Sequence, residues 1–209
     1  MTSITTMPEP LASVARSIRR CTICAPNFDH RPRPILQVGR KAKVAIFSQA
    51  PGNVAHQKGK PFFDPSGVRL RQWLGVTEAV FYDPDVFAIV PMAFCFPGYD
   101  KYGGDNPPPK VCAQTWRERL LEAMPKLELA LLIGSYSQSW HLGTARKRTM
   151  TETVRAWRSY GPLYVPTPHP SWRNNHWLKK NPWFEEEVLP EIRARIANVT
   201  KGLKSDRLG

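Results

Sequence analysis

Four cysteines occur in a pattern that is able to bind a metal centre. Cys21 and Cys24 form a Cys-x-x-Cys pair, and Cys95 and Cys112 come much later in the chain, after a hydrophobic stretch. Four thiolates around one centre are the ligand set that an iron–sulfur cluster needs. The competing interpretations are buried thiols and a structural zinc ion, whose sites usually join two close pairs. In a reducing compartment, metal ligands or buried thiols are more common than disulfides.

Two turns carry further side chains that could take part in a reaction. Residues 48–52, with the sequence Ser-Gln-Ala-Pro-Gly, directly follow an apolar run, and the turn His169-Pro170-Ser171 comes shortly after another. Ligands of open parallel sheets bind beyond the carboxyl ends of the strands, so we expect both turns to meet at one edge of a sheet. Proline and glycine also occur in ordinary turns, so either motif alone is a weak signal.

The spacing of apolar residues predicts the elements that must position these turns. Runs of strand length occupy residues 44–47, 86–92, 129–134 and 163–166. Helical spacing occurs in residues 68–74, 110–124, 151–157 and 182–199. Alternating strands and helices indicate a parallel sheet with helices on both faces. We therefore predict an α/β fold, a three-layer α/β/α sandwich around a central four-stranded parallel sheet.

Length and composition predict one globular domain. The chain has 209 residues, of which 42% are hydrophobic and 22% are charged. A chain of this length can form one domain with a hydrophobic core but is short for two domains of typical size. We expect the domain to span residues 1–200, with its cysteines in the segments 21–24 and 95–112, and a flexible tail at 201–209. Residues 96–109 are rich in proline and glycine and should form an irregular loop.

The charge balance indicates a polyanionic partner. Lys and Arg number 30 against 17 Asp and Glu, which gives a net charge of +13 and a pI near 9.9. Such a surface attracts nucleic acids, although charge alone also fits a generically basic protein. The apolar stretch 86–97 is too short to span a membrane, and the first twenty residues lack the apolar core of a signal peptide. We expect a cytoplasmic monomer.

In its motifs and their order, the chain resembles the uracil-DNA glycosylase superfamily, and within it the iron–sulfur branch called family 4. That branch has an early Cys-x-x-Cys pair and a Gly-Glu-Ala-Pro-Gly turn, which residues 48–52 resemble. A Gly-x-Pro-Phe motif follows, here residues 59–62. A strand then leads into a third cysteine, and sixteen residues separate Cys95 from Cys112, as the family spacing requires. A His-Pro-Ser turn completes the pattern, which covers most of the chain.

The resemblance implies a DNA glycosylase that hydrolyses the N-glycosidic bond of uracil or another deaminated base, a reaction of base excision repair. His169 would donate a hydrogen bond to the base as negative charge develops on it, and Phe62 would stack on the flipped base. A 4Fe-4S cluster with a structural role would be bound by Cys21, Cys24, Cys95 and Cys112. Gln49 would be the second catalytic residue, and the residues that the motifs place against the substrate are Ala50, Pro51, Gly52 and Ser171.

Three positions depart from the family pattern. Gln49 replaces a glutamate, so it can orient water but cannot act as a general base. Pro91 stands where the family has an asparagine that reads the uracil edge, and proline has neither a side-chain donor nor an N–H. Asp64 stands where the family usually has glycine; it could position water, although an acidic turn residue is the simpler explanation. The motifs therefore leave the preferred base open.

The segment after His169 is rich in basic and aromatic residues. The resemblance implies that it enters the minor groove and fills the gap left by the flipped base. We expect Trp172 to penetrate the DNA and Arg173, Lys179 and Lys180 to hold phosphates. Trp177 either shares this role or anchors the last helix to the core.

Two other functions compete with the glycosylase interpretation. One is a non-catalytic iron–sulfur protein that binds nucleic acid and whose glycosylase pocket has degenerated at Gln49 and Pro91. The other is an enzyme that acts on free nucleosides or nucleotides. The extended positive charge argues against the second function, because a small substrate does not require it.

Overall fold

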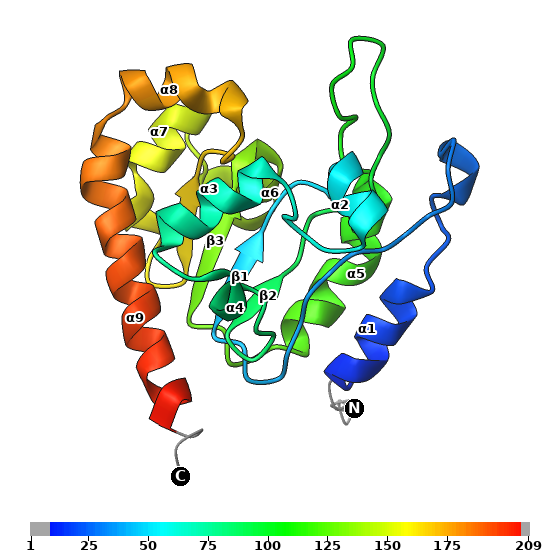
Figure 1. The fold of residues 1–209 in the computed structure, drawn as a ribbon, viewed down its shortest axis with the longest axis horizontal. Helices are drawn as coiled ribbons and strands as arrows, with labels where there is room; N and C mark the ends of the chain where they lie inside the picture. The colour runs from blue at the N-terminus through cyan, green and yellow to red at the C-terminus, as the bar shows by residue number, and fades with distance from the viewer. Residues whose placement is uncertain (1–8, 206–209) are drawn as a thin grey trace, which may run out of the picture.

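A central parallel sheet organises the molecule, in a computed structural model that describes residues 9–205. Its strands are β1 (Val44–Phe47), β2 (Phe87–Ile89), β3 (Leu129–Ile133) and β4 (Tyr164–Thr167), in the order β2-β1-β3-β4. Ile46 of β1 is paired with Ile89 of β2 on one side and with Leu131 of β3 on the other. All three pairings are parallel, so the carboxyl ends of the strands lie at one edge of the sheet (Figure 1).

Alternate strand residues point to opposite faces of the sheet and contribute to two separate cores. Val44 and Ile46 pack in one core, which is covered by α3 (Pro65–Leu74), α4 (Glu78–Phe81), α7 (Met150–Arg155) and α9 (Leu189–Ser205). Ala45 and Phe47 pack in the other, which is covered by α1 (Leu11–Arg19), α5 (Lys110–Glu122) and α6 (Gly134–Leu142). The predicted α/β/α sandwich with a four-stranded parallel sheet is therefore confirmed.

The observed elements differ from the predicted ones mainly at their ends. The predicted strand 86–92 is reduced to β2, because Pro91 has no N–H to donate to the sheet. Even so, Val90 N–H still donates to the Ile46 carbonyl at 2.9 Å, and Met92 N–H to the Ser48 carbonyl at 2.8 Å. The predicted helix 182–199 begins as a π-helix, η5 (Phe184–Val188), and continues through α9 to Ser205.

The expected tail at 201–209 is therefore helical in its first five residues, and 206–209 lie outside the described part of the chain. Several short elements had no counterpart in the sequence prediction. They are α1, α4, α6, α2 (Asn53–Lys58), α8 (Asn175–Lys180) and the 3-10 helices η1 (Ala25–Asn27), η2 (Gly143–Ala145), η3 (Trp157–Tyr160) and η4 (Trp172–Asn174).

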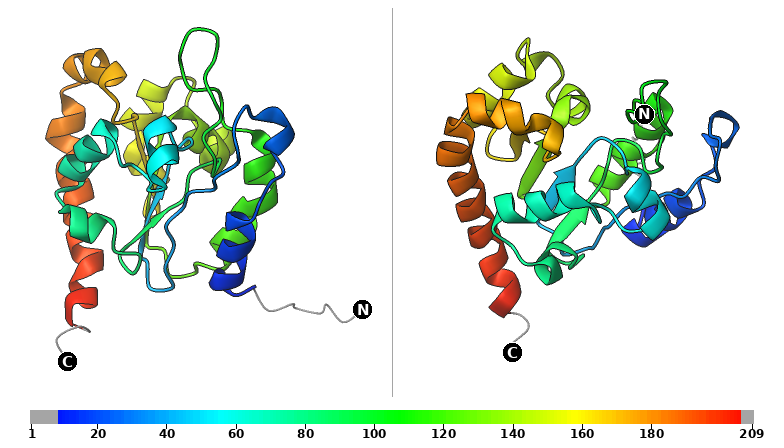
Figure 2. Two further views of the ribbon diagram at one scale, coloured as in Figure 1. Left: turned by 45° about the vertical axis from the view of Figure 1, so that its right-hand side comes forward. Right: turned by 45° about the horizontal axis from the view of Figure 1, so that its top comes forward.

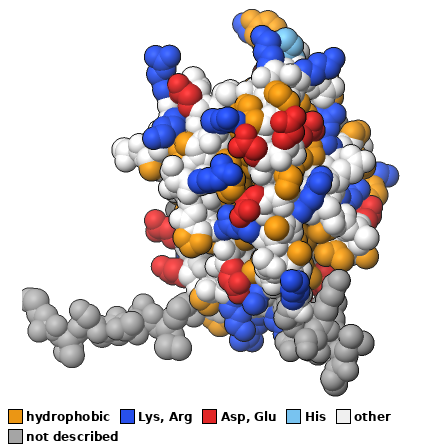
Figure 3. Space-filling view, turned by 90° about the vertical axis from the view of Figure 1, so that its left-hand side faces the viewer, with side chains coloured by type: hydrophobic (Ala, Val, Ile, Leu, Met, Phe, Trp, Pro, Cys, Tyr) orange, Lys and Arg blue, Asp and Glu red, His pale blue; other side chains and the backbone are white. Residues whose placement is uncertain are grey.

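The carboxyl edge of the sheet carries most of the irregular structure. The α2 and α8 helices lie at this end, and the loop between β2 and α5 projects from it, whereas α9 ends at the opposite end of the molecule (Figures 1 and 2). The face that α9 forms mixes basic, acidic and apolar side chains (Figure 3). Within residues 9–205, no helix combines the length and apolar composition needed to cross a membrane.

Candidate active site

A cavity of about 540 Å³ lies at the carboxyl edge of the sheet and brings the two turns together. The turn after β1 and the turn after β4 both line it, although more than a hundred residues separate them in the sequence. The residues singled out from the motifs that line this cavity are Gln49, Ala50, Pro51, Gly52, Phe62, His169, Ser171, Trp172 and Arg173. Lys179 and Lys180 do not line it; they are exposed in the last turn of α8.

One hydrogen bond orients the ring of His169, and another holds its backbone. The Ser171 N–H donates to Nδ1 at 3.2 Å, and the Asn174 side chain donates to the His169 carbonyl at 2.7 Å. Because Nδ1 accepts, the proton of the neutral ring must be on Nε2. Burial lowers the pKa of His169, an effect that nearby Asp64 opposes and nearby Arg173 reinforces. At neutral pH the ring is therefore an uncharged Nε2–H donor.

Phe62 forms an aromatic wall of the cavity. Its ring centroid lies 6.4 Å from that of His169, with 29° between the planes. Its backbone has a φ of 53°, which is unusual and strained for a bulky residue. Two neighbours hold that conformation: the Tyr82 hydroxyl lies 3.1 Å from the Phe62 carbonyl, and a Cβ at Gly67 would collide with the same oxygen. Strain retained at a pocket residue is typical of a functional position.

The turn after β1 is joined to the chain that leaves β2. The Ala93 N–H donates to the Gln49 carbonyl at 3.1 Å, so the backbone of Gln49 is fixed next to the segment that contains Pro91. Gln49 and Pro91 both line the cavity. Gln49 therefore offers a neutral amide there, while Pro91 offers only an apolar ring.

Two carboxylates line the cavity, and they have different environments. Asp64 caps α3, and its Oδ1 accepts the Gly67 N–H at 2.9 Å, as the turn-residue interpretation expected. Asp105 comes from the loop between β2 and α5, and its Oδ2 faces Gly52. Within residues 9–205 no hydrogen bond or ion pair engages the Asp105 carboxylate. Desolvation raises its pKa, although Arg173 acts in the opposite direction.

A buried arginine supports the floor of the cavity. The Arg117 side chain on α5 is 1% exposed and has no carboxylate partner among the described residues. Its Nη1 donates to the Val90 carbonyl at 3.1 Å, and its Nη2 to the Pro91 carbonyl at 2.6 Å. Burial lowers the pKa of Arg117 to about 10, so the guanidinium remains charged at neutral pH. Its hydrogen bonds satisfy carbonyls that the shortened β2 leaves without sheet partners.

Sequence reasoning missed both Asp105 and Arg117. Asp105 is an exposed residue of an irregular loop, where no pattern indicates which side chains face the cavity. Arg117 lies in a helix correctly expected from its apolar spacing, but arginine is normally exposed. The only sequence signal for Arg117 was the presence of a basic residue at a position of this helix that the apolar spacing assigns to the core.

The tryptophans after His169 have separate environments. Trp172 is 72% exposed and lines the mouth of the cavity, so it is not part of the core. Trp177 packs edge-to-face on Trp183 and Phe184, with centroids 5.7 Å away in each case, and its Nε1 donates to Thr151 at 2.8 Å. Trp177 therefore anchors α8 to α7 and the core.

The four cysteines line a second, small cavity beside the core under α1 and α5. Its other lining residues are apolar: Ile18, Phe28, Pro32, Pro34, Ala93, Phe94 and Pro109. The cavity measures about 20 Å³, near the room that one water molecule needs. Burial raises the pKa of Cys95 to about 12 and that of Cys112 to about 11. Within residues 9–205, no three His, Cys, Asp or Glu side chains are arranged to hold a metal ion.

Comparison with known proteins places the chain in a family. A family model described as the Uracil DNA glycosylase superfamily matches residues 36–193, which is most of the chain. The chain belongs to the uracil DNA glycosylase superfamily. The matched region contains both turns, Phe62 and the whole sheet, and it ends within α9. Cys21 and Cys24 lie before it, so superfamily membership does not depend on that cysteine pair.

A solved structure is also similar to this chain. It is the solution NMR structure of a "putative Uracil DNA glycosylase" from Methanosarcina acetivorans, with 14% sequence identity and a TM-score of 0.46. The similarity covers 77% of this chain and 97% of that one. At this level it says nothing about individual site residues.

Proposed function

We propose that the protein is a DNA glycosylase that hydrolyses the N-glycosidic bond of a deaminated base, with uracil as the first candidate. Superfamily membership supports glycosylase chemistry on DNA. The observation that carries the proposal for this chain is the meeting of a neutral His169 Nε2–H donor and the Phe62 ring in one cavity. A flipped base needs both an aromatic surface to stack on and a donor for its developing charge.

The reaction transfers the glycosidic electron pair to the departing base. As the bond between C1′ of the sugar and the base nitrogen breaks, negative charge spreads to the base oxygen and positive charge to the sugar. His169 donates its Nε2–H to that oxygen and so stabilises the base anion. The oxygen of a water molecule then bonds to C1′, and the released proton needs an acceptor.

Asp105 is the proposed acceptor for that proton. Gln49 is a neutral amide, so it can orient the water but cannot take its proton. Asp64 is already engaged as the cap of α3. Asp105 has no such partner within residues 9–205, and its raised pKa brings it closer to the range useful for a general base.

Base selectivity must come from groups other than residue 91. Pro91 has no polar side chain, so it cannot read the edge of a base. Gln49 and Asn174 line the same cavity and carry amide groups that can both donate and accept hydrogen bonds. We propose that these amides read the base, which makes uracil, hypoxanthine and xanthine the substrates to compare.

We also propose that the four cysteines bind a 4Fe-4S cluster, as the iron–sulfur branch of the superfamily does. Their cavity offers four thiols and no oxygen or nitrogen side chain, which is the donor set of a cluster. Within residues 9–205 the cysteines are not arranged to hold a metal ion, so either a cluster or a zinc ion would require them to move closer together. The metal content of the purified protein distinguishes the two.

The cluster would act as a structural link. It would join the segment 21–24, the chain after β2 and the first turn of α5, which carry the four ligands. It supplies covalent bonds where the sequence offers little packing, since Ile23 is 48% exposed.

A non-catalytic nucleic-acid-binding protein remains the second candidate function, because Gln49 and Pro91 both lack the side chains of the family pattern. Incubation with duplex and single-stranded oligonucleotides that contain uracil, hypoxanthine or xanthine, followed by alkaline cleavage of abasic sites, distinguishes the two. A glycosylase yields strand breaks at the modified position. Binding of these oligonucleotides without any breaks would support the second function.

A further inference from the structure

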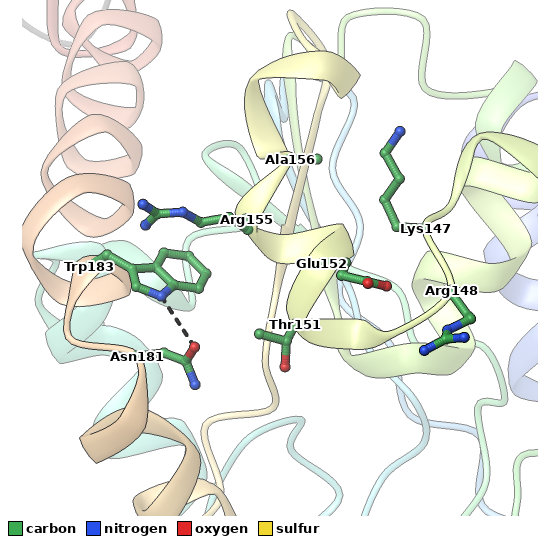
Figure 4. A pocket seen from close by; sticks show the side chains of 8 residues that line it. All are labelled: Lys147, Arg148, Thr151, Glu152, Arg155, Ala156, Asn181 and Trp183. Carbon is green, nitrogen blue, oxygen red and sulfur yellow. Dashed lines mark hydrogen bonds between the residues drawn. The ribbon is translucent and has the colours of Figure 1, made fainter.

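A second concave surface lies between α7 and the segment that follows α8. It is a groove of about 870 Å³, and its lining residues are Lys147, Arg148, Thr151, Glu152, Arg155, Ala156, Asn181 and Trp183. Figure 4 shows Arg155 and Trp183 side by side on one wall, with Lys147 and Arg148 on the opposite side. None of these residues belongs to the candidate active site.

The groove is strongly basic. Arg146, Lys147 and Arg148 form an exposed run before α7, and Lys179 and Lys180 end α8 at the side where Asn181 begins the next segment. Two acidic side chains nearby are already engaged. Glu152 accepts hydrogen bonds from Thr149 in the capping box of α7, and Glu187 pairs with Arg155 at 3.2 Å and with Arg158 at 3.7 Å. Within residues 9–205 none of these five cations forms an ion pair, although Arg148 and Lys147 help to lower the pKa of Glu152.

The walls of the groove are held in place by packing. The Arg155 guanidinium lies 4.6 Å from the centre of the Trp183 ring, and the Trp183 Nε1 donates to Asn181 at 3.2 Å. The hydrogen bond from Trp177 to Thr151 joins α8 to α7 beside it. A rigid wall with exposed cations at its rim suits an extended anion better than a small one.

The groove and the active-site cavity share the α8 segment. Trp172 and Arg173 of η4 line the cavity, α8 follows directly, and Asn181 and Trp183 then line the groove. Both surfaces therefore adjoin the α8 segment, and α8 lies at the carboxyl end of the sheet (Figure 1). A strand whose damaged nucleotide occupies the cavity can continue past α8 to the groove.

We propose that this groove binds backbone phosphates of the DNA beyond the damaged nucleotide. That the ligand is DNA rests on the proposed function. That it binds at this position rests on the groove alone. Lys and Arg side chains release condensed counterions when they neutralise phosphates, so each contact adds about 0.9 to the dependence of log K on log salt. Phosphate contacts position a protein on DNA and do not read its sequence.

The test compares two charge-reversal variants of equal charge change. The first is Lys147→Glu with Arg148→Glu. The matched control is Arg40→Glu with Lys41→Glu, since these residues are exposed in the turn before β1, at the amino edge of the sheet. Affinity for undamaged duplexes of two lengths, about 10 and 30 base pairs, is measured across a salt series. Thermal melting shows that each variant is folded.

Wild type should bind the longer duplex more tightly than the shorter one, and we expect the groove variant to lose most of that difference. The slope of log K against log salt should fall in magnitude by about two for this variant. The control should keep both the length dependence and the slope. Equal slopes for the two variants would overturn the proposal, as would a wild-type protein whose affinity does not depend on length. Because undamaged DNA is used, a wild type that binds it in this way but cleaves no base refutes the glycosylase function and leaves the groove in place.

Discussion

The ring of His169 is prepared for one role by its hydrogen bonds. A ring that accepts at Nδ1 from the Ser171 N–H can only donate at Nε2 while it is neutral. Burial keeps it neutral by lowering its pKa. The neutral ring already carries its Nε2–H donor before the reaction begins. This suits a reaction in which negative charge develops on the base.

Replacing His169 by alanine should lower the rate of base release by about 100-fold or more, as loss of one preorganised donor typically does. Affinity for undamaged DNA should stay close to that of the wild type, because the side chain lines the cavity that a flipped base would enter. Single-turnover cleavage and fluorescence anisotropy measure the two quantities. Equal cleavage rates for variant and wild type would remove His169 from the mechanism.

Asp105→Asn tests the proton acceptor, with Asp64→Asn as its matched control in the same cavity. An asparagine at position 64 can still cap α3, so this control should cleave at nearly the wild-type rate. Asp105→Asn should cleave about 100-fold more slowly, the usual contribution of a general base. In the wild type the rate should rise with pH through the raised pKa of Asp105 and then level off. A slow Asp64→Asn beside a normal Asp105→Asn would reverse the assignment.

At the scale of single residues, the sequence was informative where chemistry lies in a turn after a strand. The motifs located His169, Phe62 and Gln49, because strand order alone brings these turns to one edge. Asp105 could not be found in this way, since its place depends on how the proline-rich loop folds back over the cavity.

At the scale of elements, α5 connects the candidate cluster to the cavity. Cys112 lies in its first turn, and Arg117, just over one turn later, holds the backbone of residues 90 and 91. The cavity floor and the cysteine cavity are therefore supported by one helix. A change at either position should reach the other through α5.

Arg117→Met should lower the free energy of unfolding by about 2 kcal/mol or more, because two buried carbonyls lose their donors at about 1–3 kcal/mol each. Arg117→Lys keeps the charge and one or two of the bonds, so its loss should be smaller. Urea denaturation of the three proteins measures the difference. A methionine variant as stable as the wild type would contradict this. It would show that the desolvation of the guanidinium costs as much free energy as its hydrogen bonds contribute.

Cys95→Ser tests the cluster. Purified without oxygen, the wild type should be brown, with broad absorption at roughly 400 nm from thiolate-ligated iron. The variant should lose that absorption and bound iron, and limited proteolysis should then cut it sooner before α5. A colourless wild type that contains stoichiometric zinc would contradict the cluster assignment.

The helices that sequence patterns missed have identifiable causes. The α6 helix starts at Gly134, whose φ of 78° allows a sharp turn directly after β3, and its serine-rich sequence has low helix propensity. The α8 helix is one and a half turns long and is held by Trp177 rather than by an apolar stripe. In both cases tertiary contacts decide the structure, and no local pattern reports them.

At the scale of the whole molecule, a partly buried histidine should make the fold sensitive to acid. His141 stacks on Phe47 at 4.4 Å, and burial, with the charge of Arg117, lowers its pKa to about 3. Its unfolded pKa is about 6.5, so the unfolded chain takes up the proton first. The stability that the neutral ring contributes is complete above pH 6.5 and is lost as the pH falls from there towards 3.

His141→Phe keeps an aromatic ring against Phe47 and removes the titration. Between pH 7 and pH 4 the wild type should lose more stability than this variant, by a few kcal/mol. Urea denaturation at both pH values gives the difference. Parallel losses in the two proteins would mean that other groups cause the acid sensitivity.

The fold as a whole was predictable because four apolar runs and their order determine a parallel sheet with two covered faces. The grooves were not, since they depend on loops far apart in sequence. Arg148 and Trp183 lie on opposite sides of one groove, yet nothing in their own surroundings in the sequence indicates this. Net charge predicted a polyanionic partner without indicating where it binds.

The most direct test of the account is release of free base from DNA. A uracil-containing duplex is incubated under single-turnover conditions with wild type and with His169→Ala, and mass spectrometry quantifies free uracil against abasic sites. The account predicts equal amounts of both products from the wild type and a rate at least about 100-fold lower from the variant. If the wild type releases no base from uracil-, hypoxanthine- or xanthine-containing DNA, the glycosylase function is contradicted.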